Sequence, residues 1–284
     1  ETFRSMAFLQ VPHSIIEENV FNALKEDIGD GDITAELIPK DNISLATVIS
    51  REACVFCGLD WFEETYRQID EEILIDWCVD DGEHIEAGQI ICTLSGSSQN
   101  IVTGERIALN FVQTLSATAT VSASYAEKVS DTKTRVLDTR KTIPGLRMAQ
   151  KYAVSCGGCE NHRIGLFDAF LIKENHINAC DGIQHAVSEA RFHNPELQVE
   201  VEVEDMDELQ QAIDAGADRV LLDNFDIAML QQAVELCKGK IISEASGNIT
   251  IDNINQVAQT GVDYISTGAL TKDIKAVDLS MRFD

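Results

Sequence analysis

The spacing of apolar residues changes along this chain and divides it into two parts. Residues 14–28 have apolar positions at helical spacing, and Ser14 is expected to cap this helix. Runs of alternating or β-branched residues follow, beginning at Ser44, Glu72 and Gln89, and these runs predict strands. The first part of the chain is therefore expected to be an α+β unit.

A long helical stretch, residues 104–129, follows this first part and carries small residues where another element can approach closely. Its only arginine is Arg106, which falls in the first turn of the predicted helix. Backbone amides and the helix dipole favour an anion at that position. Arg106 is therefore a candidate ligand contact, with an ordinary surface arginine as the simpler interpretation.

A different pattern begins after this helix. Short β-branched or apolar runs alternate with helix-like segments, and the runs begin at Arg135, Ala169, Gln198, Arg219, Lys240 and Tyr264. This alternation is typical of a parallel α/β sheet or barrel. A complete barrel has eight such units, so we expect either two unrecognised units or an incomplete barrel. The alternating run at residues 276–283 is expected to return and pair with the first part.

Composition and charge exclude several classes of partner. The chain is 44% hydrophobic and 25% charged, as in globular proteins, and no apolar run approaches the length of a membrane span. Its 48 acidic and 22 basic residues give a formal charge of −26. Such a charge repels nucleic acid and anionic membranes, so neither is expected as a partner. The start lacks the features of a secretory signal, and the eight cysteines suit a reducing, cytoplasmic location.

Two pairs of cysteines have CxxC spacing, Cys54 with Cys57 and Cys156 with Cys159. Four thiolates at such spacing can bind one tetrahedral zinc ion. The first pair lies in an apolar run, however, and the pairs are far apart in the sequence. We therefore prefer the interpretation that these thiols are small buried hydrophobic groups.

Five basic residues gather within residues 138–163 of this acidic chain, opposed there only by Asp138 and Glu160; they are Arg140, Lys141, Arg147, Lys151 and Arg163. An anionic ligand needs such a local reversal of charge to bind. Arg147 and Lys151 are four residues apart on a helical stretch and are expected to be exposed or to steer phosphate. His162, beside Arg163 in a glycine-rich loop with little core to fill, is expected to be functional.

Ionisable residues follow the earlier strands of the second part, where parallel barrels place their chemistry. Lys173 suits a Schiff base, as in an aldolase. Alternatively, Glu202 and Asp223 hold magnesium or stabilise a cation in a site for polyanions, which the basic cluster favours. Glu200 and Glu204 share the strand face of Glu202, so strand alternation does not choose among these three.

The last two strands end in small residues, Ser246-Gly247-Asn248 and Thr267-Gly268-Ala269. Glycine lets backbone amides approach an anion, and a following helix adds the positive end of its dipole. Loops after the late strands of a barrel are a frequent phosphate site. The two segments therefore predict phosphate binding.

One long segment, residues 138–177, closely resembles the signature region of the quinolinate phosphoribosyltransferases. Further segments agree in the same order over nearly the whole chain: GDGDIT, GERIALNFVQTLS, VEVEVE, GADRVLLDNF, EASGNIT and STGALT. Ala117 and Cys159 stand where a glycine is usual in the family. Neither departure replaces a charged position, so both concern loop detail more than activity.

The resemblance implies a type II phosphoribosyltransferase-like α/β fold. An N-terminal α/β sandwich domain is expected over residues 1–115, joined by a C-terminal strand at 276–284, with an incomplete parallel α/β barrel over residues 116–275. The implied reaction is phosphoribosyl transfer from phosphoribosyl pyrophosphate to quinolinate with decarboxylation, which gives nicotinate mononucleotide, pyrophosphate and CO2 for NAD synthesis, with Mg2+. Two alternatives stay open: a paralogue acting on another aromatic acid, and a non-catalytic phosphate-metabolite binder.

The resemblance also implies roles for particular residues. The expected contacts with quinolinate are Arg140, His162, Arg163 and Arg106, the last reaching in from the neighbouring subunit of a homodimer. The expected catalytic residues are two lysines and an acidic pair that also holds the magnesium, namely Lys141, Lys173, Glu202 and Asp223, with Lys173 contacting substrate as well. The expected phosphate loops contain Ser246, Gly247, Asn248 and Gly268.

Overall fold

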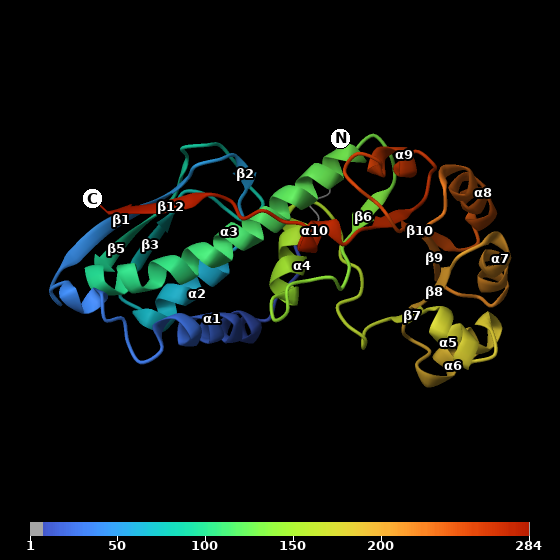
Figure 1. Ribbon diagram of the computed structural model, residues 1–284, viewed down its shortest axis with the longest axis horizontal. Coiled ribbons are helices and arrows are strands. Elements are labelled where there is room, and N and C mark those ends of the chain that lie inside the picture. The colour runs from blue at the N-terminus through green and yellow to red at the C-terminus, as the bar shows by residue number, and fades with distance from the viewer. Residues whose placement is uncertain (1–7, 284) are drawn as a thin grey trace. The chain divides into compact units, whose positions relative to one another are not determined.

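The computed structural model describes residues 8–283 and divides into two compact units (Figure 1). The first unit contains the chain up to Ala123, Thr142–Gly158 and the chain from Leu270. The second contains Ser124–Lys141 and Cys159–Ala269. The expected barrel domain, by contrast, ran without interruption from 116 to 275. Residues 1–7 and 284, which the expected domains included, lie outside the described residues.

The first unit is built on an antiparallel sheet with the strand order β12-β1-β5-β3. These strands are β1 (Ile43–Ser50), β3 (Leu74–Trp77), β5 (Ile90–Ser97) and β12 (Leu279–Phe283). The alternating run near the C-terminus returns to this sheet as expected, and Val48 of β1 lies opposite Met281 of β12. A second, two-stranded ladder joins β2 (Cys54–Val55) to β4 (His84–Ile85).

The helices of the first unit are α1 (His13–Ile28), α2 (Leu59–Ile69), the first part of α3 (Ser98–Lys128) and α4 (Arg147–Cys156), with a 3-10 turn at Ala35–Leu37. Two expectations about helix starts are wrong. Pro12 occupies the N-cap of α1 and no side chain caps the helix, so Ser14 lies inside it. Helix α3 begins at Ser98, which places Arg106 more than two turns beyond its N-terminus. The helix-dipole argument for Arg106 therefore fails.

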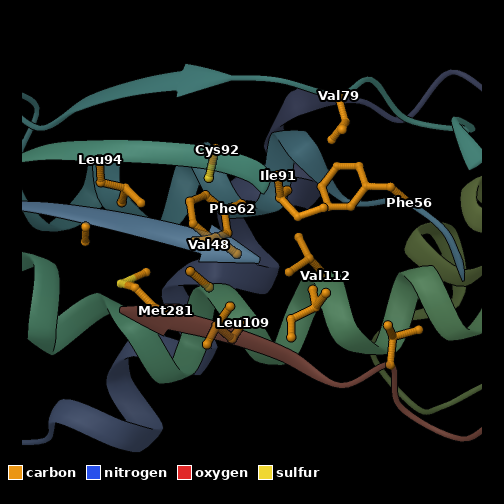
Figure 2. Close-up of a cluster of buried hydrophobic side chains, with 14 of the residues drawn as sticks. Val48, Phe56, Phe62, Val79, Ile91, Cys92, Leu94, Leu109, Val112 and Met281 are labelled. Atoms are coloured by element: carbon orange, nitrogen blue, oxygen red, sulfur yellow. The ribbon is translucent and has the colours of Figure 1, made fainter. Parts of the chain in front are cut away.

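The sheet of the first unit packs against α2 and α3 over a continuous apolar core (Figure 2). Val48 and Met281 face Phe62 of α2 and Leu109 of α3 in this core. Each large apolar side chain buried in this way contributes roughly 1.5–3 kcal/mol relative to exposure. The alternation of apolar residues along β1 and β12 thus determines which face of the sheet is covered.

Helix α4 belongs to the first unit because it packs on α1 and α3. Ala149, Ala153 and Cys156 of α4 share a second apolar core with residues of these two helices. The contact is close at the end of α4, where a Cβ atom on Gly157 would lie 2.3 Å from the carbonyl oxygen of Ala119. A side chain at this position would push α4 away from α3, so only glycine fits here.

The cysteines are all free thiols, and those of the CxxC pairs are buried. Cys54 lies in the first apolar core, while Cys57 and Cys156 lie in the second. Burial raises the pKa of Cys54 to about 11, which disfavours the thiolate that zinc requires. No cysteine in residues 8–283 joins a group able to hold a metal ion. The buried-thiol interpretation is thus supported over the zinc site.

The second unit is a parallel sheet with the strand order β6-β11-β10-β9-β8-β7. All six expected strands are present: β6 (Arg135–Leu137), β7 (Phe170–Ile172), β8 (Val199–Val203), β9 (Arg219–Asp223), β10 (Ile242–Ser246) and β11 (Tyr264–Ser266). β6 and β7 are the two ends of this sheet and do not pair with each other in the described chain, so the barrel is incomplete.

Helices cover one face of this parallel sheet (Figure 1). The main ones are α6 (Ile183–His193), α7 (Met206–Asp214) and α8 (Ile227–Cys237), and the shorter ones are α5 (Glu174–Ala179) and α9 (Ile254–Ala258). The short helix α10 (Ala269–Lys272) belongs to the first unit from Leu270 onward. The valines of β8 are buried and alternate with its glutamates. Valines and glutamates therefore point to opposite faces of the sheet. No helix in the described part of the chain could span a membrane.

Candidate active site

The face that carries the glutamates of β8 has two levels of polar side chains. Glu202 and Asp223 stand at or near the C-terminal ends of β8 and β9 and form the outer level. Glu200 and Arg219 stand two and four residues earlier on the same strands and form the inner level with Glu244 of β10. Residues separated by an even number of positions share a strand face. The sheet therefore presents two stacked charged levels.

In the outer level, Lys173 and Glu202 form an ion pair. Lys173 Nζ lies 2.8 Å from Glu202 Oε2, and the lysine immediately follows β7. Glu204 is exposed, and Glu200 belongs to the inner level. Glu200, Glu202 and Glu204 thus have different surroundings, and within residues 8–283 Glu202 is the one of the three that pairs with a lysine at the strand ends.

Both members of this ion pair influence the pKa of Asp223. Burial and then the nearby charge of Glu202 raise the pKa of Asp223, while Lys173 and Lys141 act in the opposite direction. Two carboxylates and two lysines therefore lie close enough to influence one another at the ends of β6, β7, β8 and β9. These are the four residues expected to be catalytic.

Two arginines form the cationic side of the site. Burial and then the charge of Arg140 lower the pKa of Arg163, against the opposing effects of Glu200 and Asp168. Arg163 Nη1 donates a hydrogen bond to the carbonyl oxygen of Ala169 at 3.2 Å. Arg140 and Arg163 are therefore near neighbours that repel each other, which favours an anion between them.

The segment Asn161–Arg163 is held beside β6 by Asp138, a fully buried carboxylate. Asp138 accepts hydrogen bonds from Asn161 Nδ2 at 2.7 Å and from the backbone N–H of His162 at 2.8 Å. Glu160 adds backbone bonds to β6, because its N–H donates to Val136 and its carbonyl accepts from Asp138. This positioning role of Asp138 was not predicted, although the residue directly follows β6.

The side chain of His162, which belongs to this segment, reaches the carboxylates of the inner level. Its Nε2 is 2.9 Å from Glu200 Oε2 and 3.3 Å from Glu244 Oε2. Its Nδ1 is 2.8 Å from the backbone nitrogen of Arg163, which donates to it when the ring is neutral. Burial lowers the pKa of His162, but the two carboxylates outweigh it and raise the pKa to about 9. Direct contact of His162 with quinolinate stays a prediction.

The segment Ser246–Asn248 is tied to Asp223 through Asn224. Asn224 Nδ2 donates to Asp223 Oδ2 at 3.0 Å, and Asn248 Nδ2 donates to Asn224 Oδ1 at 3.0 Å. Gly247 has a φ of 95°, and a Cβ there would lie 2.2 Å from Asn224 Oδ1. Glycine is therefore required at this position.

The expected contribution of following helices to phosphate binding is small. Helix α9 has five residues and begins only at Ile254, and α10 has four residues and begins after Gly268. A macrodipole needs several aligned turns, so the loop amides have to supply most of the attraction. The phosphate contacts of Ser246, Gly247, Asn248 and Gly268 stay predictions.

The remaining basic candidates lie in the first unit. Arg106 is exposed on α3, and Arg147 Nε donates to Thr142 Oγ1 at 3.0 Å. Lys151 is fully buried, so the expectation of an exposed side chain there is wrong. The helical spacing of Arg147 and Lys151 was correct, but it did not reveal that α4 is covered on the side of Lys151.

Comparisons with known proteins point to one family. Family models described as quinolinate phosphoribosyl transferase match the chain over residues 32–116 for the N-terminal domain and 118–282 for the C-terminal domain. A solved structure of the nicotinate-nucleotide pyrophosphorylase from Francisella tularensis is 49% identical with a TM-score of 0.95. The match covers 97% of this chain and 98% of the other.

Curated relatives have the same kind of name. A probable carboxylating nicotinate-nucleotide pyrophosphorylase from Bacillus subtilis is 38% identical, over 90% of this chain and 89% of the relative. A chloroplastic carboxylating nicotinate-nucleotide pyrophosphorylase from Oryza sativa is 39% identical, over 92% of this chain and 76% of the relative. This chain belongs to the quinolinate phosphoribosyltransferase family.

Proposed function

We infer that this protein transfers the phosphoribosyl group of phosphoribosyl pyrophosphate to quinolinate with loss of CO2, and so makes nicotinate mononucleotide and pyrophosphate. Family membership supports this assignment. The observation that carries it is the convergence of Lys173, Glu202 and Asp223 at the strand ends, with Lys141 acting on the same carboxylate. A chain of charge −26 needs such local cations to admit two polyanions.

Arg140 and Arg163 are proposed to bind the quinolinate dianion. Their mutual repulsion in the ligand-free protein is relieved when carboxylates lie between them. A hydrogen bond between a guanidinium and a carboxylate is worth about 1.5–3 kcal/mol. Two such contacts favour a dicarboxylate over nicotinate, which has one carboxylate.

Glu202 and Asp223 are proposed to stabilise the positive charge that develops on the ribose as pyrophosphate leaves. Burial and then the nearby charge of Glu202 raise the pKa of Asp223, and the effect of Glu202 shows a local negative field that favours a cation. Lys141 and Lys173 are proposed to neutralise the departing pyrophosphate, and the loop Ser246–Asn248 to hold the phosphate of the product. The ion pair of Lys173 with Glu202 argues against a Schiff base, because an ion-paired ammonium is a poor nucleophile.

Decarboxylation then needs little from the protein beyond placement. Once the ring nitrogen carries the ribose it is cationic, and it stabilises the electron pair left on the adjacent ring carbon as the carboxylate departs as CO2. A proton from water then takes the place of the carboxylate on that carbon. The proposed role of Arg140 and Arg163 in this step is to keep the ring in position. No proton transfer from a side chain is required to break the bond.

Magnesium fits the acidic pair chemically. Glu202 and Asp223 offer carboxylate oxygens at adjacent strand ends, and oxygen is the ligand that Mg2+ prefers. The charge of Glu202, after burial the second cause of the raised pKa of Asp223, would be neutralised by a divalent cation. We therefore propose these two residues as its ligands. When bound, the ion would neutralise charge on the leaving pyrophosphate.

The assembly and the location are also proposals. Arg106 is exposed on α3, which supports a role in the site of a neighbouring subunit of a homodimer. Eight free cysteines support the reducing environment of the cytoplasm.

The activity is tested by mixing the protein with quinolinate, phosphoribosyl pyrophosphate and Mg2+ and measuring CO2 and nicotinate mononucleotide. We expect the two products in equal amounts. Turnover of nicotinate or another aromatic acid in place of quinolinate would support a paralogue instead. Tight binding of the donor with no turnover of any acid would support a non-catalytic binder.

A further inference from the structure

The inner level contains charged residues that the reaction outlined above does not use. Glu200 of β8 is in register with Arg219 of β9, and Glu244 of β10 is in register with Tyr264 of β11. Glu244 is 0% exposed and Glu200 is 2% exposed. Carboxylates buried to this extent are costly unless they are paired and hydrogen-bonded. Their presence therefore calls for a physical reason.

Arg219 is the counter-ion of this buried level. Its Nη1 lies 3.3 Å from Glu244 Oε2, and its guanidinium stands 4.5 Å from the centroid of the Tyr264 ring. Glu244 Oε2 is thus shared between Arg219 on one side and His162 Nε2 on the other. The result is a continuous chain of contacts from Tyr264 through Arg219 and Glu244 to His162.

This chain continues to the substrate side of the site. In its neutral form the ring of His162 accepts the backbone N–H of Arg163 at Nδ1, whereas in its charged form Nδ1 carries a proton and cannot accept this hydrogen bond. In both forms Nε2 carries a proton that faces Glu200 and Glu244. If the ring moved away, Glu200 would lose its ion-pair partner and Glu244 would keep only Arg219, so the buried carboxylates hold the ring in position.

We propose that Glu244, with Arg219 as its counter-ion, is a positioning residue for quinolinate: it holds the ring of His162, and thereby the adjoining Arg163, in the orientation that receives the substrate. This inference rests on the proposed function, because it assumes that the segment Asn161–Arg163 faces quinolinate. Glu200 supports the same ring from the neighbouring strand.

A metal ion is the other occupant that His162, Glu200 and Glu244 could bind, since their ligand atoms lie within 4.8 Å of one another. The geometry argues against it. Arg163 N–H points at Nδ1, so the ring proton of the neutral form is on Nε2, which is the atom a metal would need. Arg219 already occupies one side of the Glu244 oxygen. Ion pairs with His162 and Arg219 account for Glu200 Oε2 and Glu244 Oε2, whereas Glu200 Oε1, Glu244 Oε1 and Arg219 Nε are buried without a hydrogen-bond partner in the described structure.

The first unit contains a matched control. Glu64 is 2% exposed, pairs with Arg67 at 2.6 Å and lies 3.6 Å from His13 Nε2. It therefore combines a buried glutamate, an arginine and a histidine, as Glu244 does. Within residues 8–283, the polar contacts of this group are all with residues of the first unit. A substitution of Glu64 thus reports the cost of disturbing a buried ion pair alone.

The test compares Glu244→Gln with Glu64→Gln by steady-state kinetics and thermal unfolding. Glutamine keeps the volume of the side chain and removes the charge. Glu244→Gln is expected to raise the Michaelis constant for quinolinate by about tenfold or more. The reason is that His162 loses its charge-assisted contact with Glu244, which holds His162 and Arg163 in the orientation that receives quinolinate. The constant for phosphoribosyl pyrophosphate is expected to stay within about twofold. Glu64→Gln is expected to lower the unfolding temperature and to leave both constants unchanged.

A second variant covers the case in which Glu244→Gln does not fold. The double substitution Glu244→Gln with Arg219→Met removes both buried charges and is expected to fold, since no unpaired charge remains. It is still expected to bind quinolinate weakly, because His162 has lost one carboxylate. Normal quinolinate constants in the folded single or double variant would overturn the proposal. Equal weakening of both substrates would overturn it as well. Absence of turnover by the unsubstituted protein would instead reject the proposed function.

Discussion

Lys173 Nζ lies 2.8 Å from Glu202 Oε2. The lysine proposed to neutralise pyrophosphate and the carboxylate proposed to stabilise the ribose cation thus form an ion pair. Lys173→Ala removes the cation proposed to neutralise pyrophosphate and leaves Glu202 without its partner. We expect the turnover number to fall by about 10²- to 10³-fold, as when one preorganised electrostatic group is lost. Steady-state kinetics measures this change.

The control for this variant is Lys238→Ala, since Lys238 is exposed and pairs only loosely with Glu235 at 4.0 Å. It is expected to behave as the unsubstituted protein. If Lys173→Ala kept a turnover number within about threefold of normal, Lys173 would have no part in the chemical step.

Arg163→Ala is expected to weaken quinolinate binding selectively. The lost contact is worth about 1.5–3 kcal/mol, which corresponds to an increase of well over tenfold in the Michaelis constant for quinolinate. Arg163→Lys is expected to recover part of this loss, because lysine restores the positive charge but lacks the planar guanidinium that binds a carboxylate through two nitrogens. Arg51→Ala, a change of an exposed arginine in the first unit, should have no effect. An unchanged quinolinate constant in Arg163→Ala would remove Arg163 from the site.

The free energy of unfolding is expected to depend on pH through His162. Glu200 and Glu244 raise the pKa of His162 from 6.5 to about 9 against the effect of burial, so the folded protein binds more protons than the unfolded chain between these values. The stabilisation is fully present below about pH 6.5 and is lost as the pH rises toward 9. His162→Gln should therefore flatten the pH dependence of stability in this window.

Urea denaturation at a series of pH values from 6 to 9 measures this effect, with the exposed His185→Gln as the control. An identical slope in His162→Gln and in the unsubstituted protein would show that the ring has no shifted pKa in the folded state.

Complementation tests the proposed sharing of the site between subunits. Arg106→Ala and Lys141→Ala should each be nearly inactive, because one lacks a quinolinate contact and the other a catalytic cation. If Arg106 acts in the neighbouring subunit, random exchange gives mixed dimers with one intact site, and roughly a quarter of full activity returns. Failure to recover activity after proven subunit exchange would favour a site made by one chain.

The six parallel strands could be predicted from the sequence because β-branched runs such as VEVEV are bounded by turn residues. The start of α3 could not, since Ser98, Gln99 and Asn100 have no apolar periodicity. Arg106 was consequently predicted to lie in the first turn of this helix, whereas the helix begins eight residues earlier, at Ser98. The membership of α4 in the first unit was also missed, because it depends on which helix its apolar face contacts.

The outer level of the site was accessible to sequence reasoning, because Lys173, Glu202 and Asp223 stand at or just after strand ends. The inner level was not. The pairing of His162 with Glu200 joins residues 38 apart and depends on the bridge that holds Glu160 beside Leu137. Strand alternation showed that Glu200 and Glu202 share a face, but only the position of this loop shows that they have different partners.

The central claim is that Arg140 and Arg163 converge to bind a dianion at the strand ends of the second unit. A crystal structure with quinolinate bound tests it most directly. We predict that oxygens of the quinolinate carboxylates lie within about 2.7–3.2 Å of nitrogens of both guanidinium groups. Quinolinate bound elsewhere, with Arg140 and Arg163 turned apart into solvent, would contradict the account.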